Sequence, residues 1–198
     1  MAVGYRKPHL PFVFPESFME HYYPKDSIQL PANPYAPVNM PTIAWRGCRE
    51  LNKYADMRAL NTSCPINSSL SDQFTLDLRR AYYSAVSWMD SLIGEVIAEL
   101  DSLGLSNKTV ISFVGDHGYQ LGEHGKWGKN TNFEIGTHAP MMIHIPGITD
   151  HGIATDQLTE FVDLYPTVVE AAGLGSIPLC PENSVHTKLC RDGTSLVP

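Results

Sequence analysis

Residues Thr109–Lys129 read TVISFVGDHGYQLGEHGKWGK. A β-branched, apolar run, typical of a buried strand, ends at Asp116 and His117, and the glycine-rich loop that follows ends in Lys129. In open α/β sheets, ligands bind at the carboxyl ends of strands, so the carboxylate and the imidazole should face one point. We therefore predict that Asp116 and His117 form part of a metal site, with Lys129 close enough in sequence to reach a bound anion.

The sequence around this run alternates between helical and extended patterns, which is the rhythm of a layered α/β domain. Apolar residues at steps of three and four predict a long helix, which Ser69 or Ser71 caps and Gly104 ends. The predicted elements are a helix over 71–103, strands over 109–115 and 141–145, and a short helix over 163–172.

Residues 1–67 hold nine of the fifteen prolines, which excludes a regular helix or a central strand there. We expect a mostly irregular excursion with one helical turn near residues 16–21. The first residues, Met1–Gly4, look like the tail of a strand, and a sheet with so few strands would leave its edges exposed. We therefore expect the later part of a larger α/β domain, incomplete at its N-terminal side.

Length and composition indicate a globular chain with enough residues for a sizeable core. The chain has 198 residues, of which 43% are hydrophobic and 18% charged, and its formal net charge is −7. This balance argues against a general nucleic-acid binder, although a local basic pocket could still bind an anionic substrate. No run of about 18 apolar residues occurs, so no membrane span is predicted.

Several features are typical of a secreted protein, although the N-terminus has no signal-peptide pattern. Asn61, Asn67 and Asn107 each begin an N-glycosylation pattern. Cys180 and Cys190 flank a short loop without metal-type spacing, which favours a local disulfide over two free thiols. For Cys48 and Cys64 the sequence leaves both alternatives open.

Four spaced motifs resemble one enzyme family. The stretch Asp116-His117-Gly118 followed by LGEHGxWxK up to Lys129 resembles the second signature of type I sulfatases, in particular their iduronate-2-sulfatase branch. The other matching pieces are VGYxKPHxPF over 3–12, THxP over 137–140, and FVDLYPT over 161–167 with AGL over 172–174. Residues 25–67 carry no such motif.

The resemblance implies an alkaline-phosphatase-like α/β fold, in which residues 1–175 would be the C-terminal portion of the catalytic domain and 176–198 the start of a C-terminal subdomain. It also implies a calcium ion, a formylglycine nucleophile made from a cysteine in C-x-P-S/A-x-R, and hydrolysis of sulfate from a glycosaminoglycan-type sugar. The implied location is the lysosome or the secreted space. The oligomeric state is not readable from the sequence.

The resemblance also implies roles for individual residues. Asp116 and His117 would be metal ligands, Lys129 would hold the sulfate and the leaving oxygen, and His9 would protonate the departing alcohol. Negative charge develops on the bridging oxygen of the sulfate ester as the S–O bond breaks. An ammonium and a protonated imidazole both stabilise that negative charge. Three further residues are candidates for substrate binding, with open alternatives: Glu123 and His124 face the substrate or support other groups, and Lys7 faces substrate or solvent.

Two parts of the family pattern are missing. No C-x-P-x-R occurs, and the paired aspartates that complete the calcium shell are absent, so we expect this chain alone to be inactive. One alternative is a phosphodiesterase or phosphatase with zinc on Asp116, His117 and His138, although His138 is expected to pack under the second strand. Another is a non-catalytic domain that binds glycan or a partner subunit. Tyr119 and Trp127 could stack on a sugar or pack under the loop.

Overall fold

The computed structural model describes residues 1–22, 24–60 and 62–197, which form two compact units. The first unit comprises Met1–Glu99 and Asp116–Ala139, and the second comprises Leu100–Gly115 and Pro140–Pro198. The helix and strand content agrees with the predicted α/β class. None of the described helices is both long and apolar enough to cross a lipid bilayer.

The first unit is mainly helical. Its α-helices are α1 (Glu16–Tyr22), α2 (Ala55–Ala59), most of α3 (Asp72–Ser102) and α4 (Glu134–Thr137), and its strands are β2 (Gln120–Leu121) and β3 (Trp127–Gly128). Short 3-10 helices are η1 (Lys25–Ser27), η2 (Thr42–Ala44), η3 (Leu51–Lys53) and η5 (Glu123–Gly125). The expected helical turn near residues 16–21 is α1, whereas the sequence did not predict α2, η1, η2 and η3 in the proline-rich region.

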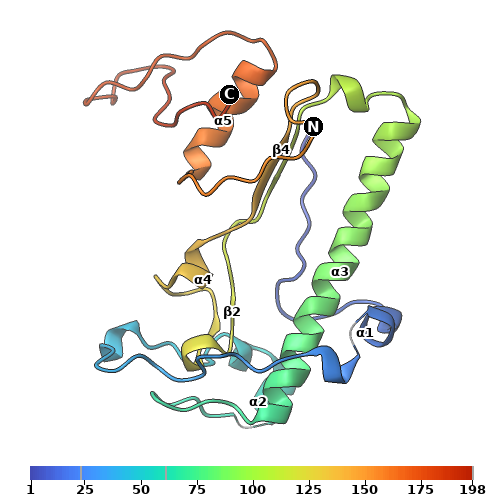
Figure 1. Cartoon of the computed structure of the whole chain (residues 1–198). Coiled ribbons are helices and arrows are strands. Elements are labelled where there is room, and N and C mark those ends of the chain that lie inside the picture. The colour runs from blue at the N-terminus through green and yellow to red at the C-terminus, as the bar shows by residue number, and fades with distance from the viewer. Residues whose placement is uncertain (23, 61, 198) are drawn as a thin grey trace. The chain divides into compact units, whose positions relative to one another are not determined.

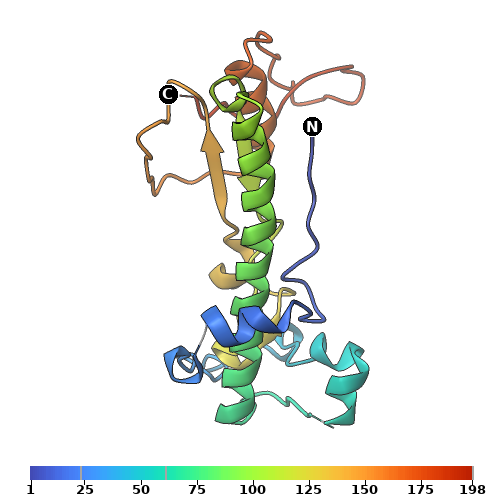
Figure 2. The same ribbon diagram turned by 90° about the vertical axis from the view of Figure 1, so that its right-hand side faces the viewer.

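Helix α3 confirms the helix predicted over 71–103 (Figure 1). The Ser71 hydroxyl accepts a hydrogen bond from the backbone N–H of Phe74 at 3.4 Å, so Ser71, rather than Ser69, contacts the first turn. Helix α1 runs across α3 (Figure 2), and a guanidinium nitrogen of Arg80 on α3 donates to the carbonyl of Met19 at 2.6 Å. This contact fixes the N-terminal segment to the long helix.

The core of the first unit joins the irregular N-terminal region to α3 and to the β2–β3 ladder. Its buried members are Leu10, Cys48, Leu51, Met57, Leu70, Leu78, Leu121 and Trp127. The Cys48–Cys64 disulfide, which the sequence left open, joins the buried Cys48 of this core to the partly buried Cys64 that packs against it. Because the proline-rich region supplies four of these residues, it is part of the packed unit rather than a surface appendage.

The second unit contains the strand pair that the sequence predicted. Strands β1 (Ile111–Val114) and β4 (Met141–His144) are antiparallel, with Ile111 opposite His144 and Val114 opposite Met141. The unit also contains η4 (Ser106–Lys108), η6 (Phe161–Asp163) and α5 (Leu164–Ala171). The two strands form a two-stranded sheet. A sheet of this size is only marginally stable without further strands or helices packed against it.

Asp163 ties the C-terminal segment of the second unit to α5. Its two carboxylate oxygens accept backbone N–H groups from Glu160 at 2.9 Å and Thr194 at 2.7 Å, and these bonds lower the pKa of the carboxyl. A disulfide joins Cys180 to Cys190 in the same segment. The described residues of this segment, 176–197, therefore belong to the same compact unit as α5.

Candidate active site

The loop that follows Asp116 is shaped by glycine at a point of close backbone approach. The N–H of Gly118 donates to the carbonyl of Gly136 in α4 at 3.1 Å, and a Cβ at Gly118 would lie 1.9 Å from the carbonyl oxygen of Ile135. No side chain fits in that space, so only glycine permits the contact. Beyond it, β2 and β3 pair with Gln120 opposite Gly128, which folds the loop back toward Lys129.

Asp116 and His117 present a carboxylate and an imidazole to the same region. The Asp116 side chain is 89% exposed, and its Oδ2 lies 3.4 Å from Nε2 of His117. The other ring nitrogen, Nδ1, donates to the Gly118 carbonyl at 2.7 Å, so Nε2 of a neutral ring carries a lone pair. A lone pair and a carboxylate at this distance repel each other unless a proton or a cation lies between them.

The two side chains fit one corner of a metal site but not a complete one. A calcium ion takes about six to eight oxygen ligands. Within the described ranges, no group of three or more His, Cys, Asp or Glu side chains is arranged to hold a metal ion. Asp116 and His117 are therefore compatible with a cation, but the His, Cys, Asp and Glu side chains in the described part of the chain do not complete a calcium site around them.

His9 is oriented by contacts within its own segment. Its Nδ1 lies 2.7 Å from the carbonyl oxygen of Leu10 and donates to it, since a carbonyl can only accept. The ammonium of Lys7 donates to the carbonyl of His9 at 3.0 Å and also to that of Pro11, which closes the turn around the histidine. Partial burial, together with the charge of Arg6, lowers the pKa of Lys7. The Lys7 ammonium therefore braces the backbone that carries His9.

An aromatic cluster brings the His9 segment next to the loop after Asp116. The Phe12 ring makes edge contacts with Tyr82 at 5.7 Å and Tyr119 at 6.5 Å, and the two tyrosine rings stack at 5.5 Å. Burial raises the pKa of Tyr82, and the nearby charges of Tyr83 and Asp116 raise it further. Tyr119 is thus packed under the loop, and so is the buried Trp127.

Lys129 pairs with a residue that the sequence analysis did not single out. Its Nζ lies 3.7 Å from Oε1 of Glu50, and the two side chains are 24% and 12% exposed. The second carboxylate oxygen, Oε2, is buried and has no hydrogen-bond partner among the described residues. Glu50 lies in the region without motifs, so only the tertiary structure reveals the pair.

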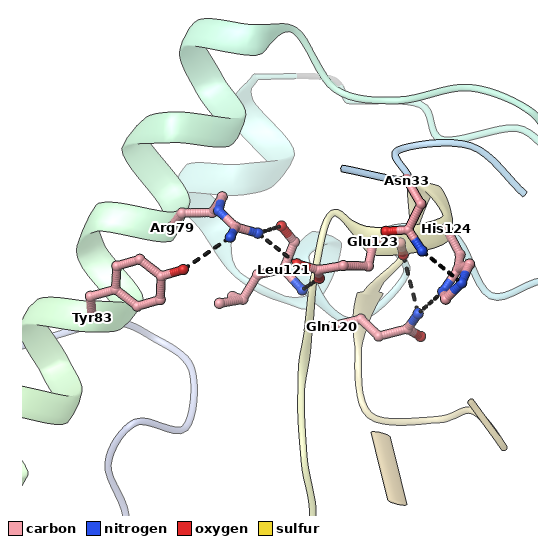
Figure 3. Close-up of polar contacts among 7 residues, drawn as sticks. All are labelled: Asn33, Arg79, Tyr83, Gln120, Leu121, Glu123 and His124. Carbon is pink, nitrogen blue, oxygen red and sulfur yellow. Dashed lines mark hydrogen bonds and ion pairs between the residues drawn. The ribbon is translucent and has the colours of Figure 1, made fainter. Parts of the chain in front are cut away.

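Glu123 supports the loop through both carboxylate oxygens (Figure 3). Oε1 accepts from a guanidinium nitrogen of Arg79 at 2.7 Å, and Oε2 accepts from the N–H of Leu121 at 2.6 Å. The same Arg79 nitrogen donates to the Leu121 carbonyl at 2.9 Å, and the other terminal nitrogen donates to the hydroxyl of Tyr83 at 2.9 Å. These contacts favour a supporting role over contact with substrate.

His124 is held on both edges of its ring (Figure 3). The buried Gln120 amide nitrogen lies 3.0 Å from Nδ1 and also donates to the Glu123 carbonyl, so Nδ1 acts as the acceptor. Nε2 lies 3.0 Å from the side-chain amide of Asn33, and the ring stacks on Phe133 at 4.0 Å. Burial lowers the pKa of His124, Glu123 opposes the shift, and Lys126 adds to it. These contacts also favour a supporting role.

The expectation that His138 packs under the second strand is wrong. Its side chain is exposed, and Nδ1 lies 3.2 Å from Oε1 of Glu134, one turn back along α4. This local pair draws the imidazole back over α4 and into solvent. Of the predicted glycosylation sites, Asn67 and Asn107 are exposed, and Asn61 lies outside the described residues.

Comparison with known proteins matches the sulfatase family model to residues 2–174. The chain is 36% identical to iduronate 2-sulfatase of Mus musculus and to that of Homo sapiens, over 99% and 100% of its length, and in both cases it covers 40% of the relative. It is 34% identical to choline-sulfatase of Rhizobium meliloti over 67% of its length, covering 24% of that relative.

A solved structure of a protein in complex with its substrate D-glucosamine-2-N,6-O-disulfate superposes with a TM-score of 0.50 and 28% identity. The superposition covers 60% of this chain and 22% of that one. The chain thus spans about 40% of the length of the iduronate 2-sulfatases it matches. The family match covers most of its residues, and the chain belongs to the sulfatase family.

Proposed function

We propose that these residues are part of a sulfuric ester hydrolase that removes sulfate from glycosaminoglycan-type sugars, as an iduronate-2-sulfatase-like enzyme in the lysosome or the secreted space. The observation that carries the proposal is the orientation of His9. Its Nδ1 is occupied by the Leu10 carbonyl, while Nε2 has no partner among the described residues and can hold a proton for the leaving alcohol.

Lys129 would bind the sulfate oxygens and the leaving oxygen, because it is the lysine that ends the matching motif, whereas the ammonium of Lys126 is engaged by the Ala44 carbonyl. The Lys7 ammonium would keep the His9 turn in place. When bound, a divalent cation polarises the non-bridging oxygens of a sulfate ester, and Asp116 and His117 would contribute two of its ligands. Calcium is the ion proposed, since the carboxylate supplies oxygen donors.

The 198 residues contain no C-x-P-x-R, so we propose that they do not turn over substrate by themselves. We also propose a domain boundary near residue 175 and glycans on Asn61, Asn67 and Asn107. If the chain belongs instead to a non-catalytic glycan-binding protein, every longer protein that contains it should bind saccharide without hydrolysing it. The presence or absence of hydrolysis therefore separates the two functions.

The test is to express the complete open reading frame that contains this chain, and to compare hydrolysis of a 2-O-sulfated uronide with that of the matching phosphate ester. We expect the sulfate ester to react at least about a hundredfold faster, because the site is tuned to the sulfate transition state. A preference for the phosphate ester, or binding without turnover, would refute the proposal. Turnover by the 198-residue chain alone would refute its proposed inactivity.

A further inference from the structure

Glu50 offsets the charge of Lys129 without using the hydrogen-bond donors of its ammonium. Nζ of Lys129 lies 3.7 Å from Oε1 of Glu50, which is an ion-pair distance and too long for a hydrogen bond. Among the described residues, no acceptor takes a hydrogen bond from this ammonium. An anion can therefore still bind the N–H groups of Lys129, but it does so beside a carboxylate that reduces the attraction.

The Glu50 carboxylate is held against strand β3. A Cβ added at Gly128 would lie 2.6 Å from Oε2 of Glu50, so the carboxylate lies directly against the β3 backbone. The N–H of Trp127 in β3 donates to the carbonyl of Gly47 at 3.2 Å, and the neighbouring Cys48 is part of a disulfide. These contacts attach the segment that carries Glu50 to the strand, so a ligand cannot easily push the carboxylate aside.

The negative charge of Glu50 acts on the loop after Asp116. The Tyr119 hydroxyl in this loop is buried and has no hydrogen-bond partner in the described part of the chain. Burial raises the pKa of Tyr119, and the charge of Glu50 raises it further. Oε2 of Glu50 is itself buried without a donor among the described residues. Since no hydrogen bond spreads the charge of this oxygen, the carboxylate repels further negative charge nearby.

Four cations share a cavity with Glu50. Arg46, Arg49, Lys53 and Lys126 line this cavity, whose volume is about 250 Å³. The first three are exposed, so water and salt screen their charges, and the ammonium of Lys126 donates to a backbone carbonyl at 2.9 Å. These cations attract any anion to a similar extent with or without Glu50. A comparison of the parent with a Glu50 variant therefore isolates the effect of the carboxylate.

Sulfate and phosphate esters have similar shapes but different charges. A sulfate monoester carries one negative charge, whereas a phosphate monoester, with a second pKa of about 6, carries two above neutral pH. The Coulomb energy of a ligand beside a fixed charge is proportional to the ligand's own charge. The repulsion from Glu50 is therefore twice as large, in free energy, for the phosphate monoester as for the sulfate monoester.

We propose that Glu50 is a specificity-determining residue, which makes the site at Lys129 select singly charged sulfate esters over doubly charged phosphate esters. The proposal rests on the function proposed above, because it requires the sulfate ester to bind at Lys129. It deepens that function by naming the residue that disfavours the phosphate ester, and by naming ligand charge as the property that this residue distinguishes.

The test measures the binding of three 2-O-esters of one uronide to the 198-residue chain by NMR titration, which also quantifies weak binding. At about pH 8 the sulfate ester and the methyl phosphate diester each carry one charge on the ester group, and the phosphate monoester carries two. The variant Glu50→Gln removes the carboxylate charge, and Asp56→Asn, at an exposed position in α2, removes a charge outside the site.

We expect Glu50→Gln to strengthen the binding of the sulfate ester and of the diester about threefold each, and that of the phosphate monoester about tenfold. The gain for two charges is the square of the gain for one, because the free energies are proportional to charge. Asp56→Asn should leave all three affinities within about 1.5-fold of the parent, since its charge is exposed and screened.

Equal gains for all three esters, or no gain in a Glu50→Gln variant with an unchanged circular dichroism spectrum, would overturn the proposal and leave the proposed function standing. A diester that behaves like the phosphate monoester would also overturn it, because the site would then distinguish phosphorus rather than charge. Lys129→Ala tests the proposed function separately, and we expect it to weaken all three esters. If it leaves every affinity unchanged, or if no ester binds the parent, both the proposal and the proposed function fail.

Discussion

The ammonium of Lys129 lies 3.7 Å from a carboxylate oxygen of Glu50, and both side chains are largely withdrawn from solvent. The Glu50 carboxylate is therefore paired with the same ammonium that, by the family resemblance, would contact sulfate. An anion that approaches Lys129 must compete with Glu50 or share the ammonium with it.

Replacing Glu50 by Gln should strengthen anion binding, because it removes a competing negative charge while preserving the shape of the side chain. We expect the affinity of the chain for inorganic sulfate to rise about threefold to tenfold, which is the scale of a partly screened charge pair. Titration calorimetry measures the change, and Asp56→Asn in α2 is the control. Weaker binding in Glu50→Gln would show that Glu50 positions Lys129 instead of competing for it.

Replacing Glu123 by Ala should destabilise the first unit. The change leaves the Arg79 guanidinium, only 11% exposed, without its carboxylate, and it removes the acceptor of the Leu121 N–H. Loss of one partner of a buried pair costs about 3 kcal/mol or more. Urea unfolding measures the difference, and Glu134→Ala, in an exposed pair with His138, should cost less than about 0.5 kcal/mol. Equal losses in the two variants would contradict a supporting role for Glu123.

Replacing Gly118 by Ala should distort the loop after Asp116, because the new methyl group would collide with the Ile135 carbonyl. A collision with backbone cannot be relieved by a rotamer change, and we expect a loss of more than about 2 kcal/mol. Gly94→Ala is the matched control, since its Cβ meets nothing within 4 Å in the middle of α3. The control should gain about 0.5 to 1 kcal/mol, and a Gly118→Ala variant as stable as the parent would contradict the close approach.

His124 should make the first unit less stable in acid. Its pKa is lowered in the folded state by burial, with Glu123 opposing and Lys126 reinforcing the shift. The contribution of a base with a lowered folded pKa is complete above its unfolded pKa of about 6.5, and it is lost as the pH falls from there through the folded pKa. Protonation also removes the Nδ1 acceptor that Gln120 uses.

The measurement is the urea midpoint at about pH 7 and about pH 5, where histidine changes charge. The parent should lose more stability between these values than His124→Asn, in which asparagine tolerates the left-handed backbone at φ 58°. His151→Asn, at an exposed position, should behave like the parent. An identical loss in parent and His124→Asn would refute the account of His124.

The sequence predicted the elements that rest on local patterns. Helix α3 follows from its spacing of apolar residues and from Ser71, and β1 and β4 follow from apolar runs that end at Gly115 and at Pro146. The fold class follows from the motifs around Asp116, and the family match agrees with it. These features depend on residues close together in the chain, so one sequence suffices to read them.

The missed features depend on contacts between distant segments. The pairing of Glu50 with Lys129 and the ring of donors around Glu123 have no periodic signal, because each joins the proline-rich region or α3 to a distant residue. The Cys48–Cys64 bond lies within the proline-rich region, and its spacing alone left the disulfide open. The prediction for His138 was wrong because of a short-range contact. A local pair with Glu134 outweighed the expected packing under the strand.

The most direct test of the central claim is the kcat/KM for hydrolysis of a 2-O-sulfated uronide. It is measured for the protein expressed from the complete open reading frame, for its Lys129→Ala variant and, as a control, for its Lys108→Ala variant. If Lys129 stabilises the leaving oxygen, Lys129→Ala lowers kcat/KM by about a hundredfold to a thousandfold, while the exposed Lys108→Ala control remains within about twofold of the parent. A Lys129→Ala variant that matches the control would contradict the proposed site.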